Sequence, residues 1–386
     1  MVRTLMTSLA ALAVSSAALA EDIKIGMSVT LSGPAGAIGQ QVVDGFNLAL
    51  SEKGGALGGV STEVIVVDNE LTPDVALTKV TGLLERDNVD IVVGTVFSNM
   101  LQTIFKPVIQ SETFLISPNA GPSTFAGRNC NPYFFVTSYQ NDQNSEALGA
   151  YATKAGLEKV FLMAPNYQAG RDNFEGFKRT FEGTIVDEVF VPLGHTDFSA
   201  EIARLAEADA DALYTFMPGG MGVRFVTQFA QAGLKDTLTF LSAFTVDETT
   251  LPAVKDNGLG LNGVANWSPT TDIAASKAFV DSFVATYGKV PGGYAMQGYD
   301  TAMLIDSALT KVGGDMSDPD AFRDALRAAE FDSLRGDFSF NSNHYPVQDF
   351  YLLNMMQRED GLWQTAIAEK ILDDHADAYA EDCRMR

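Results

Sequence analysis

Histidine, cysteine and tryptophan are scarce in this 386-residue chain, which holds three histidines, two cysteines and two tryptophans. The histidines are His195, His344 and His375, and none lies in a loop that we predict to bind a ligand. No GxSxG, HExxH or SxxK motif occurs, so a hydrolase or a metalloenzyme would lack its catalytic groups. We therefore expect no enzyme activity, no metal and no cofactor.

Long apolar runs are absent beyond the first twenty residues. There, Arg3 precedes an apolar run over 5–19, and Ala18-Leu19-Ala20 forms a small-residue cleavage site. A membrane anchor is the alternative, but the run is shorter than the ~20 residues that span a bilayer, and two acidic residues follow it. The pattern predicts a signal peptide over 1–20, cleaved after Ala20, and a soluble periplasmic protein.

Positive charge is also scarce, with 26 lysines and arginines against 49 aspartates and glutamates and a formal net charge of -23. A negative field of this size repels nucleic acid and anionic lipid, so we expect neither as a partner. An anionic ligand would have to be held by local dipoles and hydrogen bonds rather than by long-range attraction.

The two cysteines, Cys130 and Cys383, form no CxxC pair and no cluster with histidine, so no zinc site is expected. An even count in an exported protein suggests one disulfide, which would tie the C-terminal tail to the body of the chain. Two free buried thiols are the alternative, because distance along the sequence does not determine distance in space.

Strands and amphipathic helices alternate along most of the chain. The first series has strands at 22–29, 62–67, 90–95 and 113–117 and helices at 40–53, 73–86 and 99–110. After a loop over 118–132, a second series has helices at 142–155, 172–181, 198–208 and 223–232 and strands at 159–164, 184–191, 212–217 and 237–243. The pattern predicts an α/β fold of two doubly wound open parallel-sheet lobes.

The last part of the chain differs from these two series. Helices are predicted at 274–287, 294–312 and 319–329, followed by strands at 336–340 and 349–357. No low-complexity linker separates the series, and the chain exceeds the size at which one core stops growing. Several short crossings between the lobes are therefore expected.

Ligands of open α/β sheets bind beyond the carboxyl ends of the strands, so the loops there are the candidate site. Ser98 begins a helix, whose first N–H groups attract a carboxylate; helix capping alone is the alternative role for Ser98. With Asn99 and the small-residue loop of Asn119, Ala120 and Gly121, it would form a neutral cradle for an anion.

Loops of the second series supply aromatic and charged candidates. Tyr167 would hydrogen-bond or stack on a ligand. Arg171 would compensate a carboxylate or, as the alternative, pair with Asp172 on the surface. Phe216, Met217 and Phe244 end strands where a cleft would lie, although each residue type is more often found in the core.

Four segments, SVTLSGP at 28–34, LISP at 115–118, NYQAG at 166–170 and DFSAEI at 197–202, resemble the leucine/isoleucine/valine-binding-protein family of ABC importers. The resemblance implies the type I periplasmic binding fold, in which a three-segment hinge closes two lobes on a small molecule. It places 22–140 plus 266–345 in lobe 1 and 141–265 plus 346–386 in lobe 2. It also implies a monomer that delivers its ligand to a membrane permease.

The same resemblance assigns roles to individual residues. It places the ligand carboxylate at Ser98 and the 119–121 loop, an aromatic contact at Tyr167 and a bulky contact at Ile38. Amino-acid binders of the family carry an acidic residue where this chain has Phe244. A buried ammonium without a counter-charge costs several kcal/mol, so an aromatic ring, which Tyr139 would also contact, suits the site better.

The segments 129–135 and 138–142 resemble family members that take up aromatic acids such as benzoate or coumarate derivatives. Such members carry a C-terminal cysteine like Cys383, so this resemblance implies the Cys130–Cys383 disulfide. The sequence thus predicts an extracytoplasmic solute-binding component of an ABC transporter that binds a small organic acid. The alternatives are a branched-chain or other amino-acid binder and a ligand-sensing receptor subunit.

Overall fold

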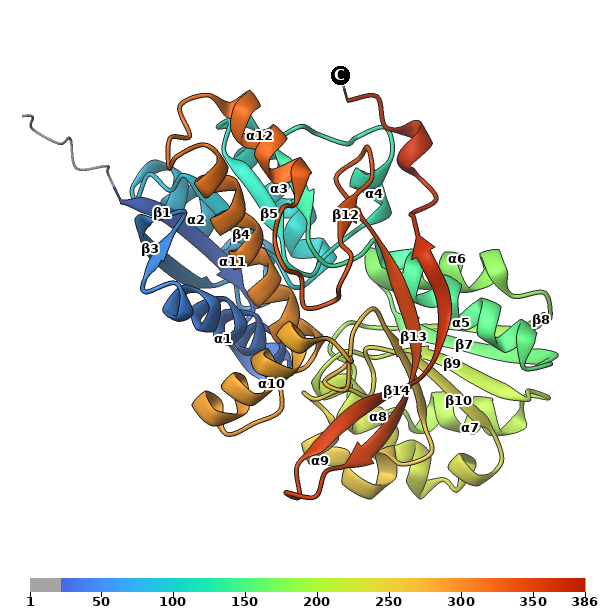
Figure 1. The fold of residues 1–386 in the computed structure, drawn as a ribbon. Coiled ribbons are helices and arrows are strands. Elements are labelled where there is room, and N and C mark those ends of the chain that lie inside the picture. Colours follow the sequence, from blue (N-terminus) through green and yellow to red (C-terminus); the bar gives the residue numbers. More distant parts are fainter. Residues whose placement is uncertain (1–21, 386) are drawn as a thin grey trace, which may run out of the picture.

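The computed structural model describes residues 22–385, and the predicted signal peptide lies outside this range. Two β-sheets, each covered by helices, form two lobes side by side (Figure 1). This is the predicted α/β architecture. The chain crosses repeatedly from one lobe to the other.

The first sheet has the strand order β2-β3-β1-β4-β5-β6 and is parallel except for the β2–β3 pair. Every residue of β4, β5 and β6 is buried, because helices cover both faces of the sheet. The strands are β1 (Ile23–Val29), β2 (Ala56–Leu57), β3 (Val60–Asp68), β4 (Ile91–Gly94), β5 (Phe114–Ser117) and β6 (Phe134–Val136).

Helices from two distant parts of the sequence cover the first sheet. They are α1 (Gly36–Glu52), α2 (Pro73–Glu85), α3 (Ser98–Gln110), α4 (Ser123–Ala126), α10 (Ala274–Tyr287), α11 (Gly293–Lys311) and α12 (Pro319–Ala328). Helices α1 and α11 pack closely: a Cβ atom on Gly45 would lie 1.9 Å from the Ala295 carbonyl oxygen. Glycine at this position therefore permits the late helix to return to the first lobe.

The second sheet has the order β12-β13-β11-β10-β9-β7-β8, and β14 pairs with β13. Its strands are β7 (Lys159–Pro165), β8 (Thr184–Val191), β9 (Ala212–Phe216), β10 (Thr239–Ala243), β11 (Asn262–Ala265), β12 (Ser339–Phe340), β13 (Pro346–Gln357) and β14 (Trp363–His375). Its helices are α5 (Asn141–Lys154), α6 (Gln168–Thr180), α7 (Ser199–Glu207), α8 (Gly220–Gln231) and α9 (Leu251–Val254). The sequence patterns did not predict β6, β11 or β14.

Three crossing segments meet at one carbonyl group. The Ser138 oxygen, after β6, accepts hydrogen bonds from Asn266 Nδ2 (3.1 Å) and Gln348 Nε2 (2.6 Å), which lie on the second and third crossings. Arg335 Nη1 donates a third bond to it at 3.2 Å, and the Arg335 guanidinium pairs with buried Asp300 at 3.0 Å. The crossings are thus fixed to one another at a single buried point.

The C-terminal tail returns to the first lobe after β14 (Figure 1). Asn343 Nδ2 donates to Asp377 at 3.0 Å, and a disulfide joins Cys383 to Cys130. The disulfide predicted from the sequence is therefore present. The lobe boundaries at 140, 265 and 345 stay a prediction. The disulfide adds a further covalent connection, between the C-terminal tail and the first lobe.

Between residues 22 and 385, no helix is long and apolar enough to cross a membrane. In the same range, no group of three or more histidine, cysteine, aspartate or glutamate side chains is arranged to hold a metal ion.

His344 gives the stability of the fold a specific pH dependence. Its ring stacks on Phe135 at 3.9 Å, its Nδ1 lies 3.0 Å from the Phe134 oxygen, and burial lowers its pKa to about 3. The unfolded chain, with a histidine pKa of about 6.5, takes up a proton first as the pH falls. As the pH falls from 7.5 to 5, the titration of this histidine should lower the free energy of unfolding by about 2 kcal/mol.

We expect His344→Asn to remove this loss, because asparagine tolerates the left-handed backbone at this position (φ 62°) and does not titrate. Urea unfolding of both proteins at pH 7.5 and pH 5 measures the effect. Parallel changes in their unfolding free energies would contradict the assignment.

Candidate functional site

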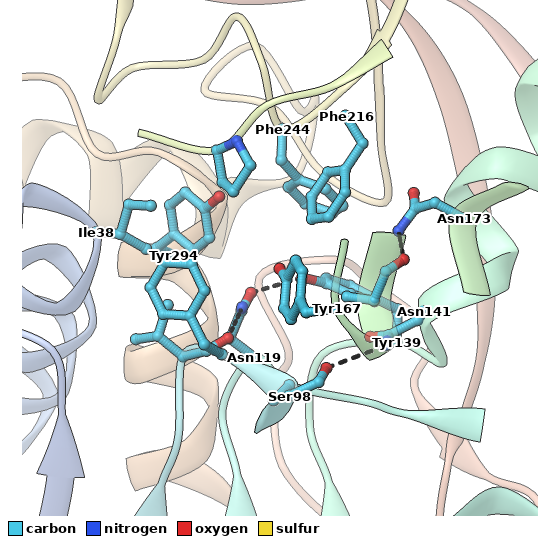
Figure 2. A pocket seen from close by; sticks show the side chains of 15 residues that line it. Ile38, Ser98, Asn119, Tyr139, Asn141, Tyr167, Asn173, Phe216, Phe244 and Tyr294 are labelled. Atoms are coloured by element: carbon cyan, nitrogen blue, oxygen red, sulfur yellow. Dashed lines mark hydrogen bonds between the residues drawn. The ribbon is translucent and has the colours of Figure 1, made fainter. Parts of the chain in front are cut away.

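A cavity lies between the lobes, at the carboxyl ends of both sheets (Figure 2). The first lobe contributes the residues after β4 and β5, and the second lobe contributes those after β7, β9 and β10. The cavity volume is about 20 Å³, which is room for about one water molecule. The lobes must therefore move apart before a small organic molecule can enter.

The cavity lining combines aromatic rings with uncharged polar groups. Its rings are Phe97, Tyr139, Tyr167, Phe216, Phe244 and Tyr294, and its polar side chains are Ser98, Asn119, Asn141 and Asn173. Ile38, Val96, Ala120, Ala169 and Pro218 complete it. None of the described residues that line this cavity carries a charge.

Ser98 lies at the polar side of the cavity, beside Asn141 and opposite Phe216 and Phe244 (Figure 2). It is the first residue of α3, and Phe97 occupies the N-cap position instead of Ser98. Ser98 Oγ accepts a bond from Asn141 Nδ2 at 3.1 Å, so its own O–H remains available as a donor. The first N–H groups of α3 have no partner within the helix and add further donors.

The loop after β5 uses its own donors within the protein. The Ala120 N–H donates to the Thr95 oxygen at 3.1 Å, and the Gly121 N–H donates to Asn141 Oδ1 at 3.1 Å. The Asn119 amide donates to the Val96 oxygen (2.7 Å) and accepts from the Tyr139 hydroxyl (2.6 Å). Donors that remain for a ligand include the Ser98 hydroxyl, the first turn of α3, and the hydroxyls of Tyr167 and Tyr294, which have no partner among the described residues.

Aromatic rings from both lobes pack against one another around the cavity. Tyr139 and Phe244 stack with centroids 5.1 Å apart, and Tyr167 and Phe216 stack at 6.1 Å. Phe216 meets Phe244 edge-on at 6.0 Å. Burial raises the pKa of both tyrosines, so their hydroxyls stay neutral. Such an arrangement offers ring faces and edges to a flat ligand.

Eight of the twelve predicted ligand contacts line the cavity: Ile38, Ser98, Asn119, Ala120, Tyr139, Tyr167, Phe216 and Phe244. Four do not: Asn99, Gly121, Arg171 and Met217. Arg171 is exposed and donates to Asn166 Oδ1 at 2.9 Å, so it contacts neither the cavity nor Asp172. Met217 packs in the core of the second lobe, because the residue after Phe216 points to the opposite face of the extended chain.

The sequence patterns missed Asn141, Asn173 and Tyr294 as lining residues. The first two lie on α5 and α6, where polar residues usually face solvent. A signal was present at α5, whose start is a capping box of Gln140 and Gln143 followed by an unusually long polar run. Tyr294 comes from α11, which only the tertiary fold brings to the cavity.

Asp172 connects the two lobes beside the cavity. Its carboxylate, on α6, accepts bonds from the Ser123 hydroxyl (2.7 Å) and the Ser123 N–H (3.1 Å), on α4 of the first lobe. It also accepts from Asn141 Nδ2 (2.9 Å), which links it to Ser98. Burial raises the pKa of Asp172, and these donors oppose that rise. The bonds to Ser123 exist only while the lobes are in contact.

Comparisons with known proteins bear on this site. The profile of the family described as periplasmic binding protein matches residues 22–360. A Leu/Ile/Val-binding protein homolog of Brucella melitensis is 25% identical over 370 residues, covering 93% of this chain and 94% of that protein.

Two solved structures are also similar. An ABC transporter solute-binding protein from R. palustris, in complex with benzoate, has a TM-score of 0.89 and 30% identity, covering 95% of this chain and 100% of that chain. A solute-binding protein of an ABC transporter from Rhodopseudomonas palustris BisB5, in complex with 3,4-dihydroxy benzoic acid, has a TM-score of 0.85 and 28% identity, covering 92% and 99%.

Replacing Ser123 by alanine should favour separation of the lobes. The variant loses one hydroxyl bond to a carboxylate, which is worth about 1.5–3 kcal/mol. Small-angle scattering at neutral pH should then give a larger mean radius of gyration than for the wild type. Ser282→Ala is the control, because its hydroxyl bonds to Glu52 within the first lobe (2.9 Å). Identical scattering from all three proteins would argue against this contact.

Proposed function

This chain belongs to the periplasmic binding protein family and is a solute-binding protein of an ABC transporter, and from that premise we propose that its ligand is an aromatic carboxylate. The observation that carries the proposal is the lining of the interlobe cavity, which has rings on most sides and an uncharged polar cluster of Ser98, Asn119 and Asn141 on one side. One polar end and an apolar remainder match a ring that bears a single carboxylate.

In the proposed complex, the carboxylate accepts hydrogen bonds from the Ser98 hydroxyl and from the first turn of α3. The helix dipole adds to these bonds by favouring negative charge at its N-terminus. The ring lies against Tyr139 and Phe244 and is covered by Tyr167 and Phe216 from the second lobe. Asn141 holds Ser98 in place and carries the contact onward to Asp172.

A branched-chain amino acid is the second candidate, supported by the name of the Brucella relative. Its ammonium group would lie beside the carboxylate and would need a counter-charge there. The family resemblance places the acidic counter-charge of amino-acid binders at the position where this chain has Phe244. The described lining residues include no carboxylate. The benzoate and dihydroxybenzoate complexes of similar proteins favour the aromatic acid.

The proposed mechanism is closure of the lobes around the bound acid. The acid docks on the first lobe, and contacts to both lobes then stabilise the closed state that a membrane permease recognises. We propose that the protein acts as a periplasmic monomer and leaves its ligand chemically unchanged. A receptor that reports its ligand to a signalling partner would use the same closure, and capture of the permease distinguishes the two roles.

A thermal-shift screen tests the ligand class. Benzoate and 4-hydroxybenzoate should each raise the melting temperature, since a ligand at 100 times its Kd adds about 2.7 kcal/mol to the unfolding free energy. Leucine and valine at the same concentration should have no effect. Stabilisation by leucine or valine, with none by the aromatic acids, would overturn the proposed ligand.

Replacing Ser98 by alanine tests the carboxylate end. The loss of one hydrogen bond to a charged group should weaken binding of the aromatic acid by ~1–3 kcal/mol, measured by titration calorimetry. Thr286→Ala is the control, because its exposed hydroxyl bonds only to the Ser282 oxygen within α10. Unchanged affinity in Ser98→Ala would exclude the serine from the binding site.

A further inference from the structure

A second chamber lies on the hinge side of the interlobe cavity. Its volume is about 30 Å³, which is room for about one water molecule or one hydroxyl group, and its lining includes Asp247, Trp267 and Gln297. Phe244 and Tyr294 line both this chamber and the cavity. The two spaces are therefore neighbours that share two aromatic side chains.

Two buried acceptors in this chamber are unsatisfied. Asp247 Oδ2 and Gln297 Oε1 are both buried, and neither has a hydrogen-bond partner among the described residues. Gln297 is only 1% exposed. Leaving such atoms unpaired costs roughly 1–3 kcal/mol each, more for a charged group. Both residues line the chamber, and buried acceptors without a partner indicate that a donor is missing there.

Two other carboxylate oxygens of the chamber, Asp247 Oδ1 and Glu248 Oε1, accept hydrogen bonds. Asp247 Oδ1 accepts from the Thr249 N–H (2.8 Å) and hydroxyl (2.6 Å). Glu248 Oε1 accepts from the Thr365 N–H and hydroxyl, both at 2.7 Å. Asp247 is therefore held at one oxygen, which fixes the direction of the other.

The charge of Asp247 affects the pKa of two tyrosines that line the cavity. Burial raises the pKa of Tyr294, and the negative charge of Asp247 is the next cause of that rise. Tyr139 shows the same effect of burial with a smaller contribution from Asp247. The ring centroids of Phe244 and Tyr294 lie 6.2 Å apart. Phe244 and Tyr294 line both spaces, so these two side chains form part of the boundary between the carboxylate and the cavity.

We propose that this chamber is a subsite for a hydroxyl group at the end of the ligand opposite to its carboxylate. Asp247 Oδ2 accepts the hydroxyl proton in a hydrogen bond, and Gln297 Oε1 is the second acceptor. This inference rests on the proposed function, because the same acid must occupy Ser98. It narrows the ligand to hydroxylated aromatic acids.

An α-ammonium group does not fit this subsite. In an amino acid, the ammonium is one carbon away from the carboxylate, so it would stay in the space that holds Ser98. Asp247 lines only the chamber behind Phe244 and Tyr294. A donor on the far side of a ring is placed toward the chamber, whereas a methoxy group there leaves both acceptors unpaired.

The test compares four acids by titration calorimetry on the full protein: benzoate, 4-hydroxybenzoate, 4-methoxybenzoate and 4-hydroxycinnamate. At least one hydroxylated acid should bind about tenfold or more tightly than benzoate, and 4-methoxybenzoate should not. Asp247→Asn keeps the acceptor toward Thr249 and replaces Oδ2 by a donor, so the preference for hydroxyl over methoxy should fall about tenfold. Gln297→Met is the second variant, and it should lower the same preference by a smaller factor.

Asp256→Asn, at an exposed position, is the matched control and should keep the wild-type preference. Equal affinities for benzoate and both hydroxylated acids would overturn the subsite and leave the proposed function standing. An unchanged preference in both Asp247→Asn and Gln297→Met would also overturn it. Failure of all four acids to bind would overturn the proposed function itself, and the subsite with it.

Discussion

The Ser138 carbonyl is the point on which the two-lobed arrangement depends. One oxygen receives a donor from each of the other two crossings, and Arg335 adds a third donor that Asp300 holds in place. Because all of these groups are buried, the loss of any one leaves others without a partner. The crossings therefore turn about a common centre, and this centre determines which loops of the two lobes face each other across the cavity.

In the complex that we propose, the two lobes make different kinds of contact with the ligand. The first lobe offers oriented donors at the start of α3, where the chain is held by Asn141, and the second lobe brings flat rings whose contact is less dependent on direction. An overall charge of -23 opposes the approach of any acid, so recognition of the carboxylate that we propose as the ligand would depend on local donors. Asp172 is compatible with this site because its carboxylate accepts hydrogen bonds from donors of both lobes.

The alternating pattern and the loop chemistry predicted most of the architecture and part of the site. Strands with long apolar runs were found, whereas β6 and β11 are too short to show a period and β14 alternates only weakly. Phe244 adopts a left-handed backbone conformation (φ 54°). This conformation is rare for bulky residues, so there was no reason to expect it from the sequence. The bend that follows places Asp247 before α9, and its free oxygen could be seen only in three dimensions.

The bridge joins Cys130 to Cys383 across a sequence separation of 253 residues, and every strand of the second sheet lies between them. A single cut by a protease anywhere inside this ring would leave one covalent molecule, because the two fragments stay linked through sulfur. The halves would also remain at high effective concentration and in register for reassociation. In a compartment exposed to proteases, this topology makes the pairing of the lobes independent of an intact backbone.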